Sequence, residues 1–483
     1  MSTRKFRGFG LVTIGVVAGV LLSVGVTAVA QRGSPLPLDE LRQLSNVFAA
    51  IKNNYVEPVD DKTLISNAIS GMVSNLDPHS AYLDAEAFRD MQTATQGEFG
   101  GLGIEVGAED GFVKVISPIE DTPAARAGIM AGDLIIKIDD TPTKGMSLND
   151  AVKLMRGAPK SPITLTIMRG DRAQPIVIKI VRDIIKVRSV RSKMLDDGVA
   201  YVRIAQFQEK TGSDLARQLK ELGAKAAPKG LVLDLRNDPG GLLTSAIGVS
   251  GAFLPPDAMV VSTDGRTPDS RHKYHATPSE YARGEGNYLA DLPAWTKTVP
   301  MVVLVNVGSA SASEIVAGAL QDHKRAKVMG NRTFGKGSVQ VILPLSETTA
   351  VKLTTSRYFT PSGRSIQATG IEPDYVVADT ADGDLFRLPR EADLQRHLSN
   401  KQDPASEVKS DPNAAEPPLG KIFEFGGKDD FQLQQALNLL AGKPVQKGSA
   451  RAQAKADIKP NASGTATQRM TITPSGVEPA KSK

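Results

Sequence analysis

Two short stretches of the chain hold residues whose types and spacing could carry out acyl transfer. A run of small residues, Gly308 to Ser313, follows the apolar segment Met301–Val305 and precedes apolar residues at helical spacing. A serine at such a strand-to-helix turn lies at a helix N-terminus, where unpaired N–H groups and the helix dipole favour developing negative charge. Farther along, Lys336 stands between two glycines, just before a predicted strand. The first stretch meets the needs of an acyl-transfer nucleophile.

The same residues also fit ordinary structural roles. Ser311-x-x-Glu314 is a capping box, in which serine accepts from the N3 amide and glutamate accepts from the cap amide. A lone lysine in a glycine-rich turn is usually solvated. The pattern by itself leaves catalysis and structure both open, because a motif is a hypothesis until its structural context is known.

The motifs GSASASE at 308–314 and FGKGSVQ at 334–340 together resemble the carboxy-terminal processing proteases, also called tail-specific proteases. The resemblance extends from about Leu36 to about Gly442. It implies a serine endopeptidase with Ser311 as the nucleophile and Lys336 as the base. The family's glutamine falls on Gln340. The implied Ser–Lys chemistry needs no metal and no organic cofactor.

A lysine base must be neutral before it can take the serine proton. An exposed lysine is neutral in well under about one part in 10³ at pH 7, so desolvation has to favour the neutral amine. If the following strand begins early, Lys336, Ser338 and Gln340 share one face, and Gln340 could then orient the amine. The alternative for Gln340 is an ordinary polar residue on an open strand face.

A second strand–loop–helix unit precedes the serine motif. It comprises a strand at 230–236, the loop Asn237–Gly241 and a helix from Leu242. Parallel strands joined by right-handed helical crossovers bring both loops to the same edge of the sheet. We therefore expect the backbone amide of Gly240 or Gly241, together with that of Ala312, to form an oxyanion hole. Which glycine donates stays open, and a plain tight turn is the alternative for each.

Residues 97–183 predict a small β-rich domain. The segment GGLGIEV at 100–106 runs into an alternating strand, and AGI at 127–129 precedes GDLIIKI at 132–138. This combination resembles a bacterial PDZ domain. The N–H groups of Leu102, Gly103 and Ile104 could bind a terminal carboxylate while the substrate tail adds as an extra strand. The helix carrying Val152 and Met155 would form the wall of that groove. A purely structural PDZ-like module is the alternative.

Arg169 follows the predicted strand at 163–168. In the family, the PDZ domain can gate the active site, and Arg169 resembles a regulatory residue used in that coupling. A surface charge is the alternative.

The N-terminal segment predicts export from the cytoplasm. Residues 2–7 are basic, 9–30 are apolar without a charge, and Ala28-Val29-Ala30 resembles a cleavage site. This pattern predicts a signal peptide, or a membrane anchor, within residues 1–32. With the basic residues on the N-terminal side, both readings place the body outside the cytoplasm. The resemblance implies a bacterial envelope protein, periplasmic and either soluble or anchored to the inner membrane.

The chain has 483 residues, 41 % of them apolar and 23 % charged, with a net charge of +5. This is enough for several domains. The absence of cysteine excludes a thiol nucleophile and disulfides, and the five histidines form no HExxH zinc motif. No basic stripe is interleaved with aromatic residues, so nucleic-acid binding is not expected.

The predicted fold class is a multidomain α/β and α+β protein whose protease core resembles the crotonase and ClpP folds. The predicted divisions are the leader at 1–32, a helical region at 36–96, the PDZ domain at 97–183, the core at 184–380, a C-terminal helical segment at 381–445 and a disordered tail at 446–483. Residues 257–295 are expected to form a long polar loop acting as a flap near the cleft.

The expected partners are protein or peptide substrates with apolar C-terminal tails. An adaptor or activator protein, and a homo-oligomer formed through the N-terminal helices, are implied by the resemblance. Two other functions stay open: an inactive PDZ adaptor, and a crotonase-like enzyme acting on acyl thioesters.

Overall fold

The computed structural model describes residues 37–448, except 110, 120–121, 171–173, 187, 283, 386–388 and 411–422. It consists of two units, one comprising the chain up to Ala85 with Ile342–Leu353, and the other comprising Glu86–Val341 with the chain from Thr354. The predicted leader at 1–32 and the predicted tail from 449 lie outside the described residues. Within the described ranges, no helix is both long and apolar enough to cross a membrane.

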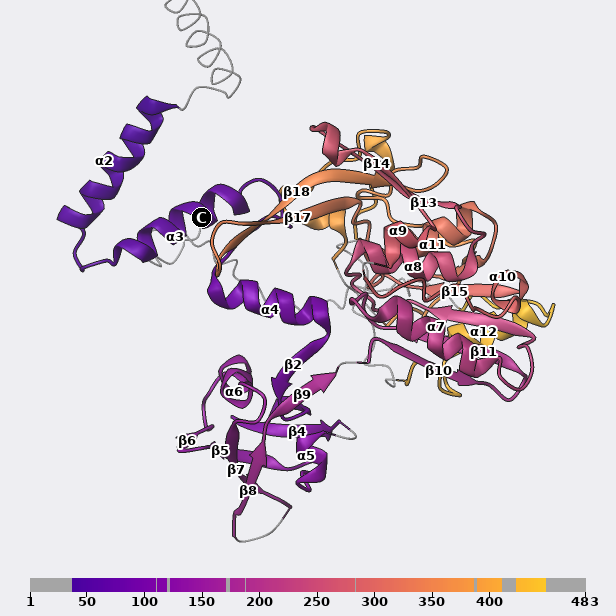
Figure 1. Cartoon of the computed structure of the whole chain (residues 1–483), viewed down its shortest axis with the longest axis horizontal. Coiled ribbons are helices and arrows are strands. Elements are labelled where there is room, and N and C mark those ends of the chain that lie inside the picture. The colour runs from indigo at the N-terminus through magenta and orange to yellow at the C-terminus, as the bar shows by residue number, and fades with distance from the viewer. Residues whose placement is uncertain are drawn as a thin grey trace, which may run out of the picture. The chain divides into compact units, whose positions relative to one another are not determined.

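The predicted core at 184–380 is built on a mixed sheet (Figure 1). Its strands, in spatial order, are β10 (Val190–Met194), β11 (Val199–Ile204), β12 (Gly230–Asp234), β15 (Met301–Val305), β16 (Lys327–Gly330) and β19 (Tyr375–Val376). Strand β10 is antiparallel to β11, and the other neighbours are parallel. The loops that follow β12 and β15 therefore leave the same edge of the sheet, as the sequence predicts.

Alternate residues of these strands enter two separate hydrophobic cores. Leu231 and Leu233 of β12 face one core, and Val232 faces the other. The first core is covered by three helices, α7 (Thr211–Leu222), α8 (Leu243–Phe253) and α11 (Ala312–Asp322). The second is covered by α12 (Phe431–Leu440). Burial on both faces explains why these strands read as continuous apolar runs in the sequence.

The expectation that residues 257–295 form a long polar loop is wrong. This segment contains the hairpin strands β13 (Met259–Gly265) and β14 (His272–His275) and the short helices α9 (Pro278–Tyr281) and α10 (Trp295–Thr298). Val260 and Val261 are buried, and β13 pairs antiparallel with the end of β18 (Ala350–Phe359). The exposed positions of these strands carry polar residues, so the sequence pattern there is typical of a loop.

The predicted PDZ domain is a five-stranded antiparallel sheet with a small additional strand. The strands are β3 (Ile104–Glu109), β4 (Phe112–Pro118), β5 (Leu134–Ile138), β7 (Pro162–Met168) and β8 (Ile176–Val181), with β6 (Thr141–Pro142) beside β5. Helices α5 (Pro123–Arg126) and α6 (Leu148–Met155) complete it. Val115, Ile135 and Leu165 are fully buried at its centre. At the two ends of the domain, β2 (Glu98–Gly101) pairs with β9 (Asp183–Lys186).

The N-terminal region is helical, as expected, with α2 (Leu38–Asn54), α3 (Asp61–Ser74) and α4 (Ala85–Gln96). Asp60 caps α3 by accepting the N–H of Thr63 at 3.1 Å. The structure adds one element that the sequence did not predict: strand β1 (Ala81–Leu83) pairs with residues 350–352 of β18. No residue of α2, which is described throughout, is buried.

In the described part of the predicted C-terminal helical segment at 381–445, the one α-helix is α12, and the rest consists of 3₁₀ turns and irregular chain. Packed chain continues past the predicted start of the tail at 446, because the Ala378 N–H donates to the Lys447 carbonyl oxygen at 2.9 Å. The remaining elements of the described chain are β17 (Ser338–Pro344) and the 3₁₀ turns at Pro268–Ser270, Glu391–Asp393 and Pro404–Ser406.

Candidate active site

Ser311 lies immediately before α11, at the edge of the sheet where β15 ends. Its backbone has φ 54° and ψ −110°, which is a strained conformation for a residue with a side chain. The neighbouring loop fixes this turn. The Asp238 carbonyl oxygen accepts the Ala310 N–H at 3.0 Å and the Ser313 hydroxyl at 2.9 Å. The serine therefore occupies a sharp, rigid strand-to-helix turn.

The main chains of Ser311 and Lys336 converge on one side chain. Oε2 of Glu314 accepts the Ser311 N–H at 2.8 Å and the Lys336 N–H at 2.9 Å. Oε1 accepts the Gly335 N–H at 2.7 Å and the Thr333 hydroxyl at 2.6 Å. The glutamate half of the predicted capping box is thus present, and the same carboxylate also holds the lysine turn.

Glu314 is fully buried, and burial raises the pKa of its carboxyl to about 7. The four hydrogen bonds act in the opposite direction, since all of them stabilise the ionised form.

Tyr358 of β18 joins the same two residues from another direction. Its hydroxyl lies 3.1 Å from the Ser311 carbonyl oxygen and also contacts the Lys336 carbonyl oxygen. The side chain is buried, and burial raises the pKa of its hydroxyl, which keeps the phenol protonated as a donor.

Gly240 contacts the serine turn directly. A Cβ atom built on Gly240 would lie 2.8 Å from the Ala312 nitrogen and 2.9 Å from the Ser311 Cβ. Only glycine fits there, and its φ of 96° also favours glycine. The loop with the two predicted glycines therefore lies beside the Ala312 amide, as the parallel arrangement of the strands predicts.

The two glycine amides differ in their hydrogen bonding. The Gly240 N–H donates to Asp238 Oδ1 at 2.9 Å. Gly241 forms a parallel bridge with Phe207, and the bonds of that bridge are made by the Gly240 carbonyl and the Leu242 N–H. The Gly241 N–H is therefore directed away from Phe207. Of the two, Gly241 is the better candidate for the oxyanion donor.

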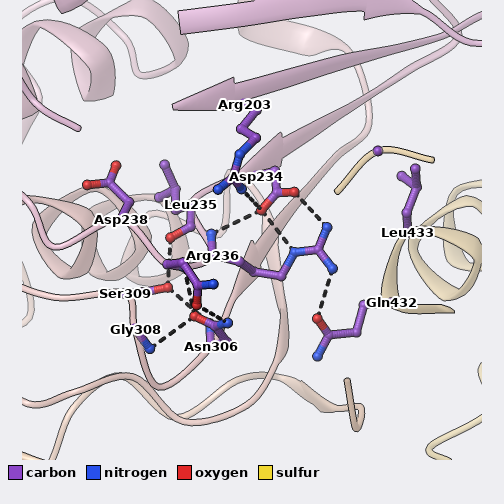
Figure 2. A network of polar contacts seen from close by, with 12 residues as sticks. Arg203, Asp234, Leu235, Arg236, Asp238, Asn306, Gly308, Ser309, Gln432 and Leu433 are labelled. Carbon is purple, nitrogen blue, oxygen red and sulfur yellow. Dashed lines mark hydrogen bonds and ion pairs between the residues drawn. The ribbon is translucent and has the colours of Figure 1, made fainter. Parts of the chain in front are cut away.

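Side chains at the strand ends hold the glycine loop against the serine loop (Figure 2). The Asn306 side-chain oxygen accepts the N–H groups of Asn237 at 2.9 Å and Gly308 at 3.0 Å. The Ser309 hydroxyl donates to the Leu235 carbonyl oxygen at 2.8 Å. Because these bonds cross between the ends of β12 and β15, the two loops keep a fixed separation.

Behind the glycine loop lies a buried ionic network. The Arg236 guanidinium donates to Asp234 at 2.9 and 2.6 Å and to Asp430 at 2.8 and 2.6 Å. Figure 2 shows this side chain reaching from the end of β12 towards Gln432 of α12, whose Oε1 it contacts at 3.0 Å. Arg203 adds an ion pair with Asp234 at 3.3 Å. Two cations thus balance two carboxylates inside the core.

Gln340 lies in β17, which begins at Ser338. The strand therefore does not include Lys336, and the condition for Lys336, Ser338 and Gln340 to share one strand face is not met. The Gln340 Nε2 donates to the hydroxyls of Ser338 and Thr354, both at 3.1 Å. Its role in orienting the lysine stays a prediction.

The residues predicted to bind a peptide lie together in the PDZ domain. Strand β3, which begins at Ile104, is the edge strand beside β4. Leu102 is buried, and the Gly103 carbonyl oxygen accepts the Ile119 N–H at 2.9 Å and the Thr122 hydroxyl at 3.1 Å. Val152 and Met155 of α6 pack into the same core as Ile104. This arrangement leaves the outer edge of β3 for an added strand.

Arg169 forms a bidentate ion pair inside the PDZ domain. It donates to the two oxygens of Asp133 at 2.7 and 2.8 Å, and to the Gly128 carbonyl oxygen at 2.7 Å. Asp133 is fully buried. A simple surface charge does not describe this residue, and its proposed regulatory coupling stays a prediction.

Three features of the site were not predicted: the attachment of the lysine turn to Glu314, the Tyr358 contacts and the Arg236–Asp430 pair. The capping box signalled Glu314 but gave no sign of a second loop. Tyr358 and Asp430 lie in segments without a recognisable sequence motif. Their contacts with the site are therefore seen only in the folded structure.

Comparisons with known proteins agree with this geometry. The sequence model of peptidase family S41 matches residues 198–377, that of the PDZ domain matches 114–169, and that of the activating protease CtpB N-terminal domain matches 24–87. A carboxy-terminal-processing protease of Bartonella bacilliformis is 46 % identical over 444 residues, covering 88 % of this chain and 95 % of the relative. The chain belongs to the carboxy-terminal processing protease family.

Two proteases of Bacillus subtilis agree with this assignment. The carboxy-terminal processing proteases CtpA and CtpB of Bacillus subtilis are 33 % and 34 % identical, covering 77 % and 75 % of this chain and 77 % and 74 % of their own lengths. A solved photosystem II D1 C-terminal processing protease is 29 % identical, with a TM-score of 0.39 over 68 % of this chain and 87 % of that one. As a member of this family, the protein is a serine peptidase with a PDZ domain for substrate binding. Membership favours the peptidase over the inactive adaptor and the acyl-thioester enzyme.

Proposed function

We propose that Ser311 and Lys336 form the catalytic dyad of this carboxy-terminal processing protease. The observation that carries the proposal is the convergence of both main chains on one Glu314 oxygen, at 2.8 and 2.9 Å, directly at the N-terminus of α11. This convergence supports the proposal, because it holds the main chains of the proposed nucleophile and base together at a helix end that favours an oxyanion.

In the proposed mechanism, Ser311 Oγ attacks the scissile carbonyl carbon while Lys336 Nζ accepts the serine proton. The negative charge that develops on the carbonyl oxygen is stabilised by the N–H groups of Ala312 and Gly241. Lys336 then gives its proton to the leaving amine, and an acyl-enzyme remains on Ser311. Water, deprotonated by Lys336, hydrolyses the acyl-enzyme and regenerates the serine. Gln340 is the further residue proposed to orient the lysine.

We propose that the PDZ domain selects substrates by adding their apolar C-terminal tail to the edge of β3. The amides of Leu102, Gly103 and Ile104 would bind the terminal carboxylate, and Val152 and Met155 would contact the last apolar side chain. The charge-free segment at 9–30, preceded by basic residues, supports a location in the bacterial envelope, with envelope proteins as substrates.

We propose that the N-terminal helices join copies of the chain. Leu41, Leu44 and Val47 of α2 are 45 %, 49 % and 51 % exposed, although they recur at helical spacing as a core-facing stripe would. An adaptor or activator protein that delivers substrates is a further proposed partner, and Arg169 is the proposed link between tail binding and activation.

The dyad is tested with the full-length chain in mild detergent. Cleavage of an unfolded protein with an apolar C-terminal tail is followed for the parent and for Ser311→Ala and Lys336→Ala. Loss of activity by about 10³-fold or more in both variants, with unchanged far-UV circular dichroism, supports the dyad. Full activity in either variant refutes it. Replacing the last residue of the substrate by aspartate tests the PDZ proposal, since it should raise KM without lowering kcat.

A further inference from the structure

We infer that Glu314 and Tyr358 are positioning residues that act as a pair and set the separation of the nucleophile and the base. The inference rests on the proposed Ser311–Lys336 dyad. Each of the two side chains contacts both residues of the dyad, Glu314 through their N–H groups and Tyr358 at their carbonyl oxygens. Neither needs to touch the substrate.

The hydrogen bonds of Glu314 use its full accepting capacity. Three of its partners are backbone N–H groups, those of Ser311, Gly335 and Lys336, which can only donate. The fourth, the Thr333 hydroxyl, already accepts the Ile371 N–H at 2.6 Å, so its own proton is directed to Glu314. Four donors around a buried carboxyl require two oxygens, and neither an amide nor a protonated acid supplies the same set.

A helix cap alone would not produce this arrangement. A capping glutamate returns to the N–H of its own cap residue and leaves its second oxygen to solvent. Here the second oxygen is buried and is used by residues 333 and 335 of another loop. The lysine turn is thereby attached to the serine turn through a single carboxylate, so a displacement of one turn would be transmitted to the other.

Tyr358 supplies an independent attachment from β18. Its main-chain N–H donates to the Gly337 carbonyl oxygen at 3.0 Å, so the strand holds the segment after Lys336 while the phenol contacts the Lys336 carbonyl. Two further groups interact electrostatically with Glu314: the Tyr358 phenol, and Arg390, which donates to the Thr333 carbonyl oxygen at 2.7 Å. The pair therefore encloses the dyad main chain on its amide side and on its carbonyl side.

The test uses the full-length chain and the variants Glu314→Gln and Tyr358→Phe. The glutamine side chain at 314 keeps one oxygen acceptor. Its amide nitrogen, however, places its own N–H groups against the N–H donors that the second carboxylate oxygen accepts in the parent. We expect kcat to fall about 100-fold in Glu314→Gln and about tenfold in Tyr358→Phe, with KM within about threefold of the parent. The double variant should lose less than the product of the two single effects, because both residues position the same pair. Matched controls are Glu221→Gln, at an exposed position of α7, and Tyr375→Phe on β19, which should retain parent activity.

A second readout does not depend on activity. Hydrogen–deuterium exchange is measured on peptides covering 309–315 and 333–338. In Glu314→Gln, both peptides should exchange about tenfold faster than in the parent. Acceleration confined to 309–315, or parent values of kcat in both single variants, would show that Glu314 only caps α11 and would overturn the inference. If Glu314→Gln does not fold, Tyr358→Phe and Glu314→Asp carry the same measurements.

The outcome separates the two proposals. If Ser311→Ala or Lys336→Ala retains activity, the dyad itself is wrong. If both lose activity while Glu314→Gln and Tyr358→Phe keep the parent kcat, only the positioning role is wrong.

Discussion

Gly240 lies against Ser311 so closely that a Cβ atom on the glycine would be 2.9 Å from the serine Cβ. The two residues come from different strand–loop–helix units, 71 positions apart by their numbers. The contact fixes where the serine lies relative to the loop that holds the proposed second oxyanion amide. It also makes the two neighbouring glycines distinguishable by experiment.

Gly240→Ala should act mainly on catalysis. The new methyl group would press on the Ala312 nitrogen and the Ser311 Cβ, so we expect kcat to fall about 100-fold, since small displacements at a reacting centre are costly. Gly241→Ala should reduce both stability and kcat, because a Cβ there would lie 2.0 Å from the Phe207 carbonyl oxygen and the clash would displace the proposed oxyanion amide. Peptidase kinetics and urea unfolding of both variants check this. Equal effects of the two substitutions on both measurements would contradict the assignment.

Ser311→Gly should be more stable than Ser311→Ala, although both are inactive. Glycine adopts φ 54° and ψ −110° without the Cβ clash that alanine retains, and the relief of such strain is worth about 1 kcal/mol. Urea unfolding midpoints of the two variants measure the difference. Ser313→Gly, in the following helical turn, serves as the comparison and should be destabilised. A lower midpoint for Ser311→Gly would show that the turn is not strained.

The Asp238→Asn variant should gain free energy of unfolding relative to the parent as the pH rises. Burial raises the pKa of Asp238 to about 8, and its Oδ2 is buried with no hydrogen-bond partner in the described structure. A carboxyl whose pKa is raised on folding stabilises the protein fully below its unfolded pKa and loses that contribution as pH rises towards 8. Asparagine stays neutral and keeps an acceptor for Gly240.

We therefore expect Asp238→Asn to gain at least about 1 kcal/mol over the parent at pH 8.5, and little at pH 4.5. Urea unfolding at the two pH values tests this, with the exposed Asp196→Asn as the control. A difference that is constant with pH would mean that Asp238 is ionised throughout.

Asp430→Asn should weaken both the fold and the active site. The asparagine can still cap α12, where Asp430 accepts the Leu433 N–H at 3.1 Å, but the fully buried Arg236 loses one of its two compensating charges. Breaking a buried pair costs about 3 kcal/mol, and Arg236 directly precedes the glycine loop, so kcat should fall as well. The neighbouring exposed Asp429→Asn is the matched control. Parent stability in Asp430→Asn would show that Asp234 alone compensates the guanidinium.

Much of this architecture can be predicted from the sequence, because burial on both faces of a strand leaves a continuous apolar run. Strand β15 is buried on both faces, so the apolar segment Met301–Val305 of the sequence coincides with its observed bounds. The parallel-strand argument likewise brings Gly240 to Ser311 without any coordinates. The hairpin of β13 and β14 escaped prediction because its exposed positions carry polar residues that read as a loop.

The contacts that tie the site together could not be predicted. Glu314 carries a local capping signal, but its bonds to residues 333–336 depend on how the two loops fold back. Tyr358 and Asp430 reach the site from distant segments, and their types have no distinctive spacing. Side-chain pairing across such distances is set by the packing of α12 and β18, which the local pattern does not encode.

The distance in sequence between Arg236 and Asp430 has a consequence for how the enzyme is made. During synthesis on the ribosome, β12 and the glycine loop are complete long before α12 emerges, so the nascent core contains a guanidinium with one of its carboxylates missing. Because an uncompensated buried charge opposes closure of the core, we expect full proteolytic competence to arise only when the chain from Asp430 onward has left the exit tunnel. Completion of the C-terminal helix would thus determine when activity begins, and an incompletely synthesised chain would not cleave other proteins.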